Sequence, residues 1–93
     1  MVINDNGREY DLDNLDSYSS MTQGIIRRLI YARYVGIRNL LSDNCCNKVK
    51  SSAIKEMIIH QDTIERIKNI FDYTDEEINF YIDYTIQNFP MVK

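Results

Sequence analysis

The segment SSAIKEMIIHQDTIERIKNIF, residues 51–71, carries the densest run of aliphatic side chains in this sequence. On a single helical wheel its apolar residues form two clusters, whose centres lie roughly 130° apart. The first cluster is Ile54, Met57 and Ile58, and the second is Ile64, Ile67, Ile70 and Phe71. One straight helix would present two different faces to one core. We therefore expect two short helices, separated by non-helical residues within His60–Asp62.

These two helices would form a helical hairpin. Asp62 is the expected N-cap of the second helix, and Glu65 follows at the spacing of a capping box. The segment DTIERIKN, residues 62–69, resembles the start of the recognition helix in small helix-turn-helix repressors. The resemblance implies a DNA-facing set made of Thr63, Arg66, Lys68 and Asn69.

The same resemblance also implies which residues of the hairpin are buried. With Ile64 at the usual buried position of the second helix, the other buried positions are Ala53, Met57, Ile59 and Ile67. Two residues depart from the pattern, because Ile54 stands where a small residue is usual and Ile58 where glycine permits the turn. The alternative is an ordinary helical hairpin within a bundle, with no role in DNA binding.

The N-terminal residues indicate a β-hairpin. Asn6-Gly7 lies between two short apolar or mixed runs, and this dipeptide favours a type I′ turn with positive φ at both positions. Apolar residues then recur at three-residue spacing and predict a short helical turn that docks the arm. They are Leu12, Leu15 and Tyr18.

A long helix follows, opened by a capping box of Ser20 and Gln23 and running towards Leu41. Its apolar face comprises Ile26, Leu29, Ile30, Tyr34, Ile37, Leu40 and Leu41. Arg33 falls in the middle of that face. Either its guanidinium meets a carboxylate, or the helix breaks near Gly36 and the register changes. Arg33 is a candidate partner-binding residue, since residues that break a local pattern are often functional.

The remaining segments are a loop and a last helix. Residues 42–50 have no periodicity, and they include Cys45 and Cys46, which we expect to be free thiols. Thr74 and Glu77 form a further capping box. The last helix is expected over residues 75–88, with Pro90 preventing its extension. Its core stripe is Ile78, Tyr81, Ile82, Thr85, Ile86 and Phe89.

Length and composition place these elements in one small domain. The chain has 93 residues, of which 44% are hydrophobic and 27% charged, as in globular proteins. The expected fold is mainly α, with four to five helices and a short N-terminal β-hairpin. We expect a single domain over residues 1–93, in which residues 1–18 form the hairpin and arm and residues 20–93 the helical core. There is no run long enough for a membrane span and no signal peptide, so a cytoplasmic location is expected.

Charge is unevenly distributed along the chain. Residues 1–26 carry one basic group against five acidic ones, residues 27–68 nine against four, and residues 69–93 one against five. Within the basic part, Arg27, Tyr31 and Arg38 fall on one side of the long helix, with Arg28 beside them. This set suits phosphate, nucleic acid or an acidic protein patch. The alternative is that it pairs with the protein's own acidic termini.

Two aromatic residues of the last helix lie outside its core stripe. Phe80 and Tyr84 are one turn apart on the polar side. Either the N-terminal arm covers them, or they form a contact patch for a second copy or a partner.

Catalysis has little support in the sequence. There is one histidine, His60, and no phosphate loop or nucleophile motif. The adjacent Cys45 and Cys46 lack zinc-ligand spacing. We expect no cofactor and no metal.

The expected function is a non-enzymatic binding protein that acts as an inhibitor or adaptor on a larger host or phage protein or nucleoprotein. The residue usage suggests an AT-rich coding genome, such as that of a phage or mobile element. Nucleic acid and a second copy are further partners to consider, and a helix-turn-helix regulator is the alternative function.

Overall fold

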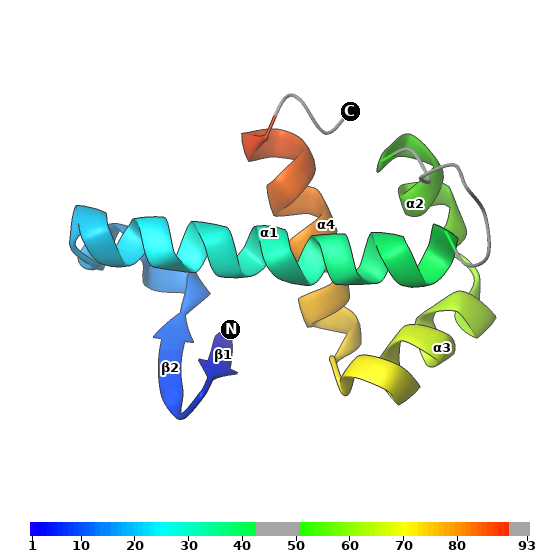
Figure 1. The fold of residues 1–93 in the computed structure, drawn as a ribbon, viewed down its shortest axis with the longest axis horizontal. Helices are drawn as coiled ribbons and strands as arrows, with labels where there is room; N and C mark the ends of the chain where they lie inside the picture. The colour runs from blue at the N-terminus through cyan, green and yellow to red at the C-terminus, as the bar shows by residue number, and fades with distance from the viewer. Residues whose placement is uncertain (43–50, 90–93) are drawn as a thin grey trace.

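The computed structural model describes residues 1–42 and 51–89, which form a mainly α-helical fold with a two-stranded N-terminal sheet. Figure 1 shows the long helix α1, Ser20–Ser42, crossing in front of α4, Asp75–Asn88. The hairpin lies below the N-terminal half of α1, and α2 and α3 lie beside its C-terminal half. The expectations for Cys45, Cys46 and Pro90 fall outside the described residues.

The β-hairpin is confirmed. Strands β1, Val2–Asp5, and β2, Arg8–Asp11, pair in antiparallel fashion. The connecting Asn6 and Gly7 have φ values of 53° and 87°, as the tight turn requires. Ile3 pairs with Tyr10, and both side chains are buried. The hairpin therefore presents one apolar pair to the helices, which provides the packing that an isolated hairpin lacks.

The short helical turn is also confirmed, as the 3₁₀ helix η1, Leu12–Ser17. Leu12 is buried, and its N–H donates to the carbonyl of Met1 at 2.8 Å. Tyr18 closes the arm, because its hydroxyl accepts a hydrogen bond from the backbone N–H of Asp11 at 2.8 Å. These bonds fix the hairpin against the start of α1.

Helix α1 is continuous, so the break considered near Gly36 does not occur. A Cβ at Gly36 would lie 3.5 Å from the ring of Phe71, so this ring of α3 packs closely against α1 at Gly36. The expected N-cap was wrong by one residue. Ser19 caps the helix by accepting a hydrogen bond from the N–H of Thr22, and Gln23 instead donates to the carbonyl of Tyr18.

The interruption expected in residues 51–71 is confirmed. Helix α2, Ser51–Met57, and helix α3, Gln61–Phe71, are separated by three residues, and His60 has extended backbone geometry. The expected cap at Asp62 is wrong. Helix α3 starts earlier, because the carbonyl of His60 already accepts from the N–H groups of Thr63 and Ile64. His60 is the N-cap residue without a side-chain bond, and Asp62 lies in the first turn.

Helix α4 has the bounds expected from its capping box, which Thr74 and Glu77 form in full. Its core stripe packs against α1, and Ile78, Tyr81, Ile82 and Thr85 are buried. The buried face of α1 agrees with expectation as well, with Ile26, Ile30, Tyr34, Ile37 and Leu41 buried. No helix in the described part of the chain is long and apolar enough to cross a membrane.

Candidate interaction surfaces

Helix α1 carries most of the candidate residues. It has four arginines and no acidic residue among its 23 residues. Because no carboxylate lies on the same helix, each arginine must be neutralised by another element or by solvent and counterions. The structure separates the four into different environments.

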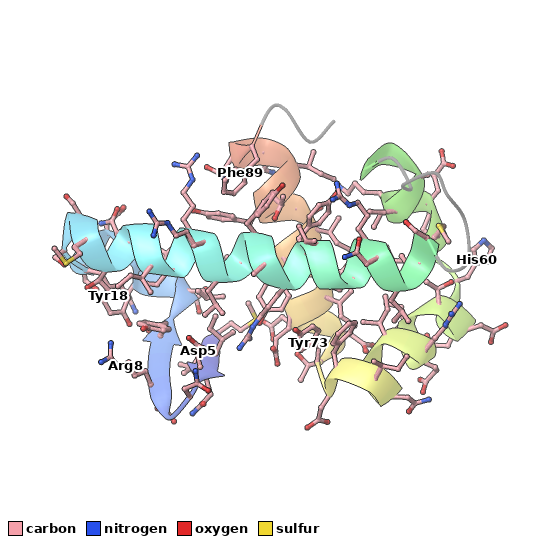
Figure 2. All side chains as sticks on the ribbon, in the orientation of Figure 1. Asp5, Arg8, Tyr18, His60, Tyr73 and Phe89 are labelled. Carbon is pink, nitrogen blue, oxygen red and sulfur yellow. The ribbon has the colours of Figure 1, made fainter. Side chains whose placement is uncertain are left out.

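Arg27 and Tyr31 hold the end of α4. The Nη2 group of Arg27 donates to the carbonyl of Asn88 at 2.8 Å, and its guanidinium lies 4.7 Å from the ring centroid of Phe89. The rings of Tyr31 and Phe89 are 4.9 Å apart, and Figure 2 shows Phe89 at the end of α4. The last carbonyls of a helix lack partners within it and attract cations. This part of the expected basic surface therefore has a structural role.

Arg38 and Arg28 differ from this pair. The guanidinium of Arg38 lies 5.8 Å from the ring centroid of Tyr34, and its buried Nε–H donates no hydrogen bond to any described residue. Arg28 is exposed, and no hydrogen bond or ion pair joins it to any described residue. The four residues Arg27, Arg28, Tyr31 and Arg38 thus do not form one uniform free surface.

Arg33 lies at the junction of three elements. Its Nη1 donates to the hydroxyl of Tyr81 on α4, and its Nη2 donates to the carbonyl of Asn4 on β1, each at 2.6 Å. The same Nη1 lies 3.8 Å from Glu77 Oε2, and the Arg33 side chain is only 16% exposed. Its guanidinium also lies 5.5 Å from the ring centroid of Tyr73. Of the two possibilities for Arg33, the half-buried ion pair is the one that occurs.

The Arg33 cluster is closed on itself. The Tyr81 hydroxyl accepts from Arg33 and donates to Glu77 Oε2 at 2.9 Å. A tyrosine hydroxyl is protonated at neutral pH, and burial raises the pKa of Tyr81 further above its ordinary value. A cavity of about 370 Å³ lies beside the cluster, between β1 and the start of α4. Of the charged residues that line the cavity, Arg33 and Glu77 are paired with each other, as expected for a structural network, and Asp72 is the third.

Phe80 and Tyr84 stack on each other, with ring centroids 5.7 Å apart. Both are half-buried and pack against the core. Phe80 also meets the ring of Tyr81 edge-on at 6.4 Å. The pair is therefore partly used inside the fold, and its predicted contact with another chain stays a prediction.

The residues expected to face DNA do not share one environment on α3. Arg66 and Asn69 are exposed, whereas Thr63 and Lys68 are half-buried. Lys68 pairs with Asp75 at 3.1 Å, and this hydrogen bond raises the pKa of the lysine.

The packing of the helical hairpin also differs from the repressor pattern. Ile59 was expected to be buried but is 80% exposed, while Ile54 and Ile58 are buried. The N–H of Ile58 still donates to the carbonyl of Ile54, so Ile58 lies one helical turn after Ile54 on the buried side, and the turn that follows leaves Ile59 in solvent. Ile59 lines an open groove of about 460 Å³ between α2 and α4, beside the Lys55–Asp83 ion pair. The DNA-motif expectation for the buried positions is thus wrong at Ile59.

Exposed apolar side chains on α1 were missed from the sequence. Met21 is 80% exposed and Ile25 is 41% exposed. Their positions on the helical wheel could have revealed them, because both lie far from the core face that Ile26, Ile30 and Tyr34 define.

Within residues 1–42 and 51–89 no group of three His, Cys, Asp or Glu side chains is arranged to hold a metal ion. Comparisons of the chain with protein families, curated proteins and solved structures gave no match.

Proposed function

We propose that this protein is a small non-enzymatic binding protein that occupies a surface of a larger protein, as inhibitors and adaptors do. The observation that carries the proposal is the exposed side of α1. Met21 and Ile25 stand in solvent there beside Arg28, on a helix with no acidic residue. Exposed apolar side chains next to an unpaired arginine are typical of protein interfaces.

The polar clusters support a binding role over a catalytic one. A catalytic acid or base needs an acidic or basic atom that is within reach of a bound substrate and can exchange a proton with it. In the Arg33–Tyr81–Glu77 cluster the functional atoms bond to one another and to the Thr74 cap. We also propose an intracellular setting and a phage or mobile-element origin, and residue usage supports the second of these.

Affinity capture with the tagged full chain tests this proposal. The chain is incubated with lysate of its source cell, with and without nuclease, and captured proteins are quantified by mass spectrometry. We expect at least one larger protein to be retained in near-stoichiometric amount after nuclease treatment. Retention of nucleic acid alone would contradict the proposal and favour the alternative.

The alternative function is a helix-turn-helix DNA-binding regulator. One observation favours it: α2 and α3 are joined by three residues, and Arg66 and Asn69 are exposed on the second helix. Two observations weigh against it. Lys68 is paired with Asp75, and both Asp62 and Glu65 are exposed on α3, where they would repel phosphates.

Duplex DNA binding at low and moderate salt separates the two functions. A regulator releases counterions on binding, so its affinity falls steeply as salt rises, and Arg66→Ala reduces that slope. A protein-binding module shows no such binding.

A further inference from the structure

The side of α1 that faces away from the core carries its own apolar stripe. The stripe consists of Met21, Ile25, Arg28 and Ala32. Their spacings of four, three and four residues place them within roughly 60° on a helical wheel. The core face, centred on Ile30, lies on the opposite side of the wheel, about 170° away. Helix α1 therefore has two faces with apolar side chains, of which only one packs against the other elements among residues 1–42 and 51–89.

This second face is open in the structure. No other described element is drawn in front of α1 in Figure 1, and the N-terminal half of α1 extends beyond α4. Met21 is 80% exposed, and Ile25, Arg28 and Ala32 are exposed as well. Gly24 borders the stripe, and a Cβ built there would meet no atom within 4 Å. A partner backbone thus has room to approach closely beside Ile25.

Charge restricts what docks here. Arg28 is the single charged residue of the stripe, no described residue neutralises it, and α1 offers no carboxylate at all. A second copy that paired through the same stripe would bring only further arginine, because α1 has no acidic residue. A DNA phosphate would satisfy Arg28 but would leave Met21 and Ile25 without apolar partners. A protein segment that combines apolar side chains with a carboxylate provides apolar partners for Met21 and Ile25 and an anionic partner for Arg28.

The spacing of the stripe also restricts the partner's shape. Residues at four- and three-residue intervals form the seam that a second helix matches with the same intervals. From Met21 to Ala32 the stripe is about 16 Å long at 1.5 Å per residue, which is about three helical turns. We propose that this stripe, Met21–Ile25–Arg28–Ala32, docks an acidic amphipathic helix of the partner protein, with its carboxylate on Arg28. The inference rests on the proposed function and names the surface and the chemistry of its partner.

The test uses the full chain and a synthetic amphipathic helical peptide of about three turns, with leucines at alternating three- and four-residue spacing and one glutamate at the edge of that face. A matched peptide has lysine in place of the glutamate. Titration is followed by NMR through the methyl signals of Met21, Ile25 and Ala32. We expect these signals to shift with the glutamate peptide, and binding to weaken about tenfold with the lysine peptide or with Arg28→Glu.

Ile25→Gln should also weaken binding, whereas Ile59→Gln, at the exposed turn between α2 and α3, is the matched control and should not. Several results would overturn the inference. Equal binding of both peptides, or no binding, would contradict the role of the carboxylate or of the stripe. Peptide-induced shifts confined to other methyl groups would place the site elsewhere. The same methyl shifts on concentrating the protein alone, or on adding duplex DNA, would show that a second copy or DNA docks there instead.

A photo-crosslinker at position 24 then separates this inference from the proposed function. Crosslinking in lysate to an acidic amphipathic segment of a protein supports both. If a protein is captured but crosslinks only from position 80 on α4, the proposed function stands and the docking stripe is wrong. If no protein is captured, the proposed function itself fails, even where the peptide binds.

Discussion

The guanidinium of Arg33 and the hydroxyl of Tyr81 meet at 2.6 Å, although the two residues are 48 positions apart in the chain. This bond joins α1 to α4. Because Arg33 also donates to the carbonyl of Asn4, the same side chain ties the N-terminal hairpin to the helices. An arginine has donors in a fixed planar fork, which suits it to bridging several acceptors in this way. The helix that carries the proposed docking stripe is thus held on its core side by a half-buried polar network.

Removing the Tyr81 hydroxyl tests the importance of that network. Tyr81→Phe leaves Arg33 and Glu77 half-buried with one partner fewer, so we expect a loss of about 1–3 kcal/mol in the free energy of unfolding. Urea denaturation measures it. Tyr31→Phe is the matched control, since that ring keeps its contact with Phe89, and it should change stability by less than about 0.5 kcal/mol. Equal effects of the two variants would contradict a special role for the Tyr81 hydroxyl.

The same hydroxyl predicts a dependence on alkaline pH. Burial raises the pKa of Tyr81 above its ordinary value of 10.0. Above pH 10 the unfolded chain therefore loses this proton while the folded protein keeps it. The contribution of the Tyr81 proton to the free energy of unfolding is therefore fully present below pH 10. It falls by about 1.4 kcal/mol for each pH unit above that. The stability gap between the wild type and Tyr81→Phe should shrink between pH 9 and pH 11. A constant gap would show that Tyr81 ionises equally in both states.

Local signals in the sequence were sufficient for much of the fold. Asn6-Gly7 predicts the hairpin because few residue pairs tolerate positive φ at both positions, and the structure has that geometry. Thr74 and Glu77 predict the start of α4 because the capping box needs only residues within one turn. The interruption before α3 followed from two apolar faces that one helix cannot bury together.

Other features depend on contacts that no local pattern reveals. The partners of Arg33 come from β1 and α4, so the sequence left open whether α1 breaks or an ion pair forms. The cap of α3 was misplaced because backbone geometry at His60 starts the helix before Asp62. The exposed apolar residues of α1 were missed, although the helical wheel separates them from the core face, and Arg27 and Arg28 looked alike on that wheel. Their difference arises from the end of α4, which reaches only one of them.

The two helix starts give a direct comparison. Thr74→Ala should lower the free energy of unfolding by about 1 kcal/mol, because Thr74 caps α4 through its side chain. Asp62→Ala removes only a favourable charge from the first turn of α3, and we expect a loss of about 0.3–0.5 kcal/mol. That smaller loss should decrease with added salt. Thermal unfolding at two salt concentrations measures both, and a larger loss for the Asp62 variant would show that it is the cap after all.

Two glycines should respond in opposite directions to alanine. Gly24→Ala should raise the free energy of unfolding by about 0.4–1 kcal/mol, because the added Cβ meets no atom and alanine favours the helix. Gly7→Ala should lower it by about 1–2 kcal/mol, because Gly7 has a φ of +87° in the hairpin turn. Chemical denaturation checks both. Destabilisation by Gly24→Ala would mean that another element covers this part of α1.

Arg27 and Arg28 are neighbours in sequence, yet charge reversal should affect them differently. Arg27→Glu loses the bond to the Asn88 carbonyl and the contact with the Phe89 ring, and it places a negative charge at the negative end of α4. We expect it to lower the free energy of unfolding by about 1–2 kcal/mol, and the electrostatic part of this loss should shrink as salt is added. Arg28→Glu removes no contact among the described residues and should change stability by less than about 0.5 kcal/mol.

Melting curves of both variants at low and high salt measure these effects. A stable Arg27→Glu variant would show that α4 does not need this contact, and an unstable Arg28→Glu variant would show that its face of α1 is covered within the protein and is not free for a partner.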